Sequence, residues 1–136
     1  MFNKITNIKY DKDQYNIYDY MDSENNKSYI IKGNTQDGND HILRNALIIL
    51  DKYVGVKVET DKLIWLHGDG PSPHFILYKD ENLKLDSMMV TKFVKSLLPK
   101  KSNIDKELIC SRLSDVKLTE IKGMVNVIEK KLKKLL

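Results

Sequence analysis

The stretch at residues 63–78 constrains the fold most, because it holds two short apolar runs separated by a turn-forming sequence. Residues 63–66 read LIWL and residues 75–78 read FILY. Continuous apolar runs of this length, bounded by turn signals, are typical of strands that are buried on both faces. The intervening HGDGPSPH contains the glycine, aspartate and proline that favour a turn. The pattern predicts a central hairpin with Trp65 in the core.

Further strands are expected on the N-terminal side of this hairpin. Residues 2–10, 14–21 and 28–32 are rich in β-formers and are joined by short polar turns, which predicts an antiparallel meander. Residues 56–60, VKVET, alternate between apolar and polar side chains, as a half-buried strand does. We therefore expect one more strand directly before the hairpin.

Two amphipathic helices complete the expected core. The first begins at Asn39 or Asp40 and ends at Gly55, which suits a left-handed stop position. The second is capped by Asp86 and ends before Pro99, because proline cannot continue the hydrogen-bond ladder. The apolar stripe of the first helix comprises Ile42, Leu43, Ala46, Leu47, Ile49, Leu50 and Tyr53.

These segments predict the α+β fold class, with an antiparallel or mixed sheet of about five to six strands covered by two helices. The order is three strands, a helix, three strands and a helix. It allows a degenerate duplication, which would put both helices on one face of the sheet. Residues 1–99 form this core domain. Residues 100–136 are expected to form a basic helical hairpin, packed on the core or extending from it, with helices at residues 104–116 and from Thr119 onward.

The positive charge of the chain is concentrated in this C-terminal part. The net charge is +4, but residues 1–98 carry 13 basic and 14 acidic side chains, whereas residues 99–136 carry 10 and 5. Lysines there are suited to contact phosphate groups. Because only two of the basic residues are arginines, such binding is expected to be largely independent of sequence. The candidate nucleic-acid-binding residues are Lys100, Lys101, Lys122, Lys130, Lys133 and Lys134.

The expected function is that of a small non-enzymatic module that binds nucleic acid or acts within a nucleic-acid-handling complex. Five of the seven tyrosines lie in the meander, where exposed rings could stack on unpaired bases. The loop at Trp65 could add contacts that recognise the shape of the ligand. The alternative is that these tyrosines are half-buried sheet residues. A composition rich in lysine, asparagine and isoleucine is typical of an AT-rich genome, such as that of a phage or mobile element.

Two other functions remain open. The chain could be a protein-interaction module, an inhibitor or an assembly factor, in which the apolar stripe that ends at Leu135 and Leu136 docks on a partner or on a second copy. It could also be a metal-dependent hydrolase. His67 and His74 would then lie opposite each other at the base of the hairpin loop and share a divalent metal with Asp69. The same residues also fit a rigid loop with polar side chains at its lip. No other cofactor is expected.

A cytoplasmic protein without a membrane partner is expected. No apolar run approaches the roughly 20 residues that cross a bilayer. The N-terminal residues lack the apolar segment of a signal peptide. Cys110 is the only cysteine, which excludes an internal disulfide and favours a reducing compartment.

Overall fold

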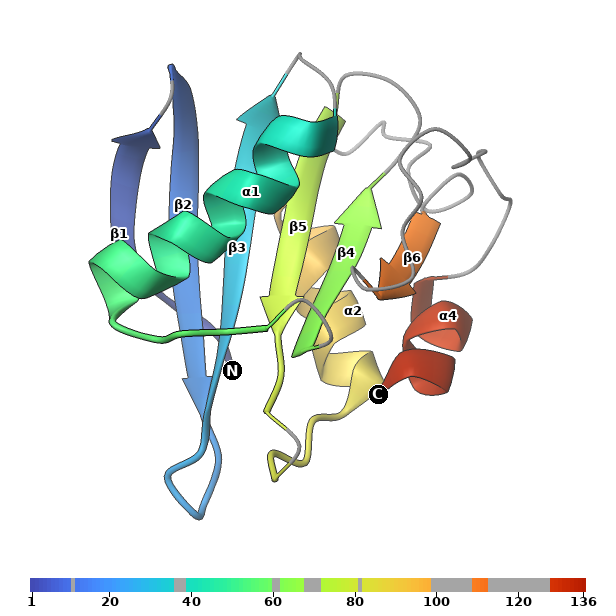
Figure 1. Cartoon of the computed structure of the whole chain (residues 1–136). Helices are drawn as coiled ribbons and strands as arrows, with labels where there is room; N and C mark the ends of the chain where they lie inside the picture. The colour runs from blue at the N-terminus through green and yellow to red at the C-terminus, as the bar shows by residue number, and fades with distance from the viewer. Residues whose placement is uncertain are drawn as a thin grey trace.

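A six-stranded sheet forms the centre of the molecule, as shown in Figure 1. The computed structural model describes residues 1–10, 12–35, 39–59, 62–67, 72–80, 82–98, 109–112 and 128–136. The strand order is β1-β2-β3-β5-β4-β6, and every neighbouring pair is antiparallel. The strands are β1 (Asn3–Tyr10), β2 (Asp13–Met21), β3 (Lys27–Thr35), β4 (Leu63–His67), β5 (Ser72–Tyr78) and β6 (Ile109–Arg112).

Helices cover both faces of this sheet (Figure 1). On one face, α1 (Asn39–Ile49) continues directly into the short π-helix η1 (Leu50–Val54). On the other face lie α2 (Ser87–Ser96) and α4 (Ile128–Leu135). The α+β prediction is confirmed. The expectation that a tandem would put its two helices on one face is wrong, because the central strands carry apolar side chains on both faces and both faces need cover.

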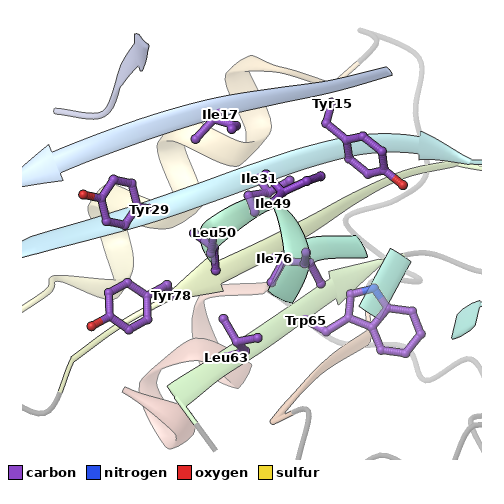
Figure 2. Close-up of a cluster of buried hydrophobic side chains, with 11 residues drawn as sticks. Tyr15, Ile17, Tyr29, Ile31, Ile49, Leu50, Leu63, Trp65, Ile76 and Tyr78 are labelled. Atoms are coloured by element: carbon purple, nitrogen blue, oxygen red, sulfur yellow. The ribbon is translucent and has the colours of Figure 1, made fainter. Parts of the chain in front are cut away.

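The central strands build two hydrophobic cores, one on each face. Successive side chains of a strand point to opposite faces, so a continuous apolar run serves both cores at once. The α1-side core (Figure 2) comprises Tyr15, Ile17, Tyr29, Ile31, Ala46, Ile49, Leu50, Leu63, Trp65, Ile76 and Tyr78. The α2-side core comprises Phe2, Tyr18, Ile30, Ile64, Leu66, Phe75, Leu77, Val90, Val94 and Leu132.

The hairpin at residues 63–78 forms as the sequence predicts. Its register pairs Leu63 with Tyr78 and Leu66 with Phe75. Trp65 is fully buried in the α1-side core. The hairpin therefore lies inside the sheet, between β3 on one side and β6 on the other.

Local signals for helix ends are also confirmed. Gly55 has a φ of +82°, and its backbone N–H donates to the carbonyl oxygen of Leu50. The Oδ1 atom of Asp86 accepts a hydrogen bond of 3.0 Å from the backbone N–H of Met88 at the start of α2. Tyr53 was predicted to lie in the buried apolar stripe of the first helix, but 43% of its surface is exposed. It lies in η1, whose wider turn departs from the 3.6-residue spacing on which the predicted stripe depended.

Two segments differ from the predicted secondary structure. Residues 56–59 form no strand. Val56 and Val58, two residues apart, both pack against the α1-side core, which explains the strand-like alternation in the sequence. Residues 109–112 form β6, which pairs with the free edge of β4, so the predicted helix over residues 104–116 is wrong at these positions. The rest of that predicted helix lies outside the described residues.

The last helix is part of the core. Leu132 is fully buried in the α2-side core, and Leu135 and Leu136 pack partly buried against it. Leu132 is therefore covered by the chain itself and is not exposed for docking on a partner. The domain boundary at residue 99 stays a prediction, because most of residues 99–127 lie outside the described part of the chain.

Replacing Leu132 by alanine tests the packing of α4. The substitution removes a fully buried leucine, so we expect the free energy of unfolding to fall by about 2–5 kcal/mol. Urea denaturation followed by Trp65 fluorescence measures this change. Lys130→Ala on the exposed side of the same helix is the control and should leave the midpoint nearly unchanged. A midpoint unaffected by Leu132→Ala would contradict the packing of α4 on the sheet.

Two stacked tyrosines predict a loss of stability at alkaline pH. The rings of Tyr29 and Tyr78 lie 6.0 Å apart, and their hydroxyl groups point the same way in Figure 2. Burial raises the pKa of both phenols above the usual 10.0; nearby Asp80 raises that of Tyr78 further, and Asp19 that of Tyr29. The folded state therefore favours the neutral phenols. Their contribution to stability is complete below the unfolded pKa and is lost as the pH rises through the folded pKa.

Thermal melts from about pH 8 to about pH 11 measure this effect. In Tyr78→Phe one of the two ionising groups is gone, so the melting temperature should fall less steeply across this range than in the wild type. Identical slopes for the two proteins would contradict the assignment.

Candidate nucleic-acid interface on helices α2 and α4

The two helical layers differ in charge. Together α2 and α4 contain six lysines and one glutamate, a net charge of +5. By contrast, α1 and η1 contain two basic and two acidic residues, a net charge of zero. The sheet therefore carries one neutral helical layer and one strongly positive helical layer.

The packing of each helix on the sheet turns its lysines outward. On α2 the buried residues Val90 and Val94 are four apart, one helical turn, and Lys92 and Lys95 lie on the exposed side. On α4 Leu132 is fully buried, whereas Lys130, Lys133 and Lys134 are exposed. Because the apolar side of each helix is buried against the sheet, its lysines face away from the sheet.

The two helices are neighbours on the same face of the sheet. Both contribute to the α2-side core, and Figure 1 shows α4 beside α2. Their exposed cations form one positively charged surface, which we call the basic layer. It consists of Lys92, Lys95, Lys130, Lys133 and Lys134.

An ion pair within α4 reduces this charge only slightly. Lys133 Nζ lies 3.3 Å from Glu129 Oε1, at the i,i+4 spacing of a helix, and 66% of the lysine side chain is exposed. Exposed pairs of this kind contribute only about 0.3–0.5 kcal/mol. The pair therefore holds the ammonium group of Lys133 only weakly.

The structure places three of the predicted lysines in this layer and leaves the others undescribed. Lys130, Lys133 and Lys134 are exposed on α4, and Lys100, Lys101 and Lys122 lie outside the described residues. Sequence reasoning missed Lys92 and Lys95. Their positions opposite the apolar stripe of α2 were visible in the sequence, but the contact between α2 and α4 that joins them to the C-terminal lysines was not.

Three of the five tyrosines in the meander are buried. Tyr15, Tyr18 and Tyr29 are buried, and Tyr18 meets the edge of Phe93 with ring centroids 4.9 Å apart. Trp65 is also fully buried, so its side chain is not available to a ligand. For these four residues the predicted contacts with nucleic acid are wrong, because their rings are packed in the two cores. Tyr10 and Tyr20 are half-buried, and a role for them or for the loop after Trp65 stays a prediction.

His74 is a buried residue that contacts Trp65 through a hydrogen bond and ring stacking. It is only 3% exposed, and its ring stacks on the indole at a centroid distance of 5.8 Å. Trp65 Nε1 donates a hydrogen bond of 3.3 Å to His74 Nδ1. Because the indole nitrogen can only donate, Nδ1 is the acceptor of this hydrogen bond.

The predicted metal site is only partly described. The register of β4 and β5 ends at Leu66 and Phe75, one step before His67 and His74, so the backbone agrees with the expected pairing. Asp69 and the side chain of His67 lie outside what the structure describes. Within the described residues, no group of three or more histidine, cysteine, aspartate or glutamate side chains could hold a metal ion. The metal site at His67, Asp69 and His74 stays a prediction.

Comparison with known proteins adds no functional information. No protein-family model, curated protein or solved structure matches this chain. In the part of the chain that the structure describes, no helix combines the length and the apolar character needed to span a membrane. The basic layer is therefore the feature from which we infer a function.

Removing the imidazole tests whether His74 acts in the core. We expect His74→Phe to lower the free energy of unfolding by about 1–3 kcal/mol, because the buried indole N–H loses this acceptor. Chemical denaturation followed by the fluorescence of Trp65, the single tryptophan, measures the loss. Dialysis against a chelator should leave the melting temperature of the wild type unchanged. A chelator effect that disappears in His74→Phe would instead support the metal site.

Proposed function

We propose that this protein is a non-enzymatic nucleic-acid-binding module that holds the phosphate backbone on its basic layer. The observation that supports the proposal is the charge difference between the two helical layers, +5 on α2 and α4 against zero on α1 and η1. A protein that binds a polyanion through one face needs this kind of asymmetry, since phosphate contacts provide most of the affinity.

The chemistry of lysine determines the kind of binding. An ammonium group is a compact charge on a flexible stem, so it neutralises a phosphate without fixing the orientation of a base. Arginine, which reads guanine through two parallel hydrogen bonds, is absent from α2 and α4. The binding should therefore depend strongly on salt and weakly on sequence.

Charge reversal on one layer at a time tests the proposal. Lys92→Glu combined with Lys130→Glu should weaken binding at least about tenfold and make the slope of log affinity against log salt shallower by about two, because two phosphate contacts are lost. Fluorescence anisotropy with a labelled oligonucleotide over a salt series gives both quantities. The matched control is Lys52→Glu combined with Lys57→Glu on the α1 side, which changes the net charge equally.

The control double variant should bind nearly as well as the wild type. Equal losses in the two double variants would show that net charge, and not the basic layer, governs binding. A flat salt dependence of the wild type, or equal competition by polyglutamate and nucleic acid, would contradict the proposed function.

A further inference from the structure

An apolar pocket of about 470 Å³ opens next to the basic layer, between the N-terminal segment and α2. Its apolar walls include Phe2, Met88, Met89 and Phe93, and its polar lining includes Asp86 and Lys92. Lys92 belongs both to the pocket and to the basic layer. A ligand that occupies the pocket is therefore within reach of the positive surface.

The two phenylalanines in the pocket lining belong to a group of packed aromatic rings. The ring centroid of Phe93 lies 5.2 Å from that of Phe2 and 4.9 Å from that of Tyr18, and Phe2 is itself buried. At the outer rim, 47% of the surface of Met88 is exposed. Methionine is flexible and polarizable, so it adapts to the face of a flat ring. The pocket lining thus combines packed aromatic rings with an exposed, adaptable methionine.

Charge indicates which ligand fits. Lys95 lies three residues beyond Lys92 on α2, and the lysines of α4 extend the positive surface further. The pocket lining also contains the carboxylate of Asp86, whose Oδ1 caps α2. Phosphates are repelled there and attracted toward Lys92. The complementary ligand is a chain of negative charges that carries flat, mostly apolar side groups.

We infer that the pocket receives an unpaired base of a single-stranded nucleic acid whose phosphates lie on the basic layer, an inference that rests on the proposed function. In a duplex the bases are stacked and paired in the interior, so only phosphates reach the protein surface. In a single strand a base can turn outward and pack against apolar and aromatic side chains. The protein then prefers single strands to duplexes without reading their sequence.

Binding of a labelled single-stranded oligothymidylate and of a blunt duplex of the same length tests this preference. We expect the single strand to bind at least about fivefold more tightly at equal salt, the lower end of what one packed base contributes. Met88→Gln should remove about fivefold of the single-strand affinity and leave duplex binding unchanged. Met21→Gln is the matched control, since Met21 is 53% exposed but lies on β2, outside the pocket lining.

Methionine oxidation gives a second readout without any substitution. Met88 and Met21 are similarly exposed, at 47% and 53%, so peroxide should oxidise both in the free protein. A saturating single strand should protect Met88 and leave Met21 reactive, as read by mass spectrometry. The duplex should protect neither residue.

The outcomes separate this inference from the proposed function. Equal affinities for single strand and duplex, with no effect of Met88→Gln and no protection of Met88, would show that the pocket receives no base. The basic layer would then remain as the binding surface. If neither nucleic acid binds at low salt, the proposed function fails and this inference fails with it. Stronger single-strand binding that Met88→Gln and not Met21→Gln reduces would support both.

Discussion

Two rows of buried side chains, one on each face of the sheet, hold the structure together. On the α1 side, Ile17, Ile31, Ile76 and Trp65 face one another across four strands. On the α2 side, the next residues of the same strands, Tyr18, Ile30, Leu77 and Ile64, form a parallel row. Each fully buried large side chain contributes roughly 1.5–3 kcal/mol. The two rows share one backbone, so both faces must be covered at once.

This two-sided burial decides where a ligand can bind. An open sheet would offer its tyrosines to bases, whereas here Tyr15, Tyr18 and Tyr29 are packed beneath helices. In the part of the chain that the structure describes, the accessible surface therefore lies mainly on the outer sides of the helical layers and at the sheet edges. Since the α1 layer is neutral and the α2 and α4 layer is positive, the geometry of the core leaves one helical face suited to a polyanion.

Features with a local physical cause were predictable from the sequence. The hairpin at residues 63–78, the cap at Asp86 and the left-handed stop at Gly55 depend on a few neighbouring residues and are all confirmed. Features that depend on distant partners were not. Residues 109–112 become a strand because β4 offers an unpaired edge, and Val56 and Val58 alternate because they pack on the core without joining the sheet. Likewise, three of the predicted lysines are exposed on α4, but their association with Lys92 and Lys95 required the packing of α4 beside α2.

The central claim is that the positive layer on α2 and α4 is the face that meets nucleic acid. Mapping amide chemical shifts of the isotope-labelled protein during titration with a single-stranded oligonucleotide tests it most directly. The structure predicts perturbations concentrated on residues 87–96 and 128–135, with residues 39–54 of α1 and η1 unchanged. Perturbations concentrated on α1 and η1, or no perturbation at low salt, would contradict the claim.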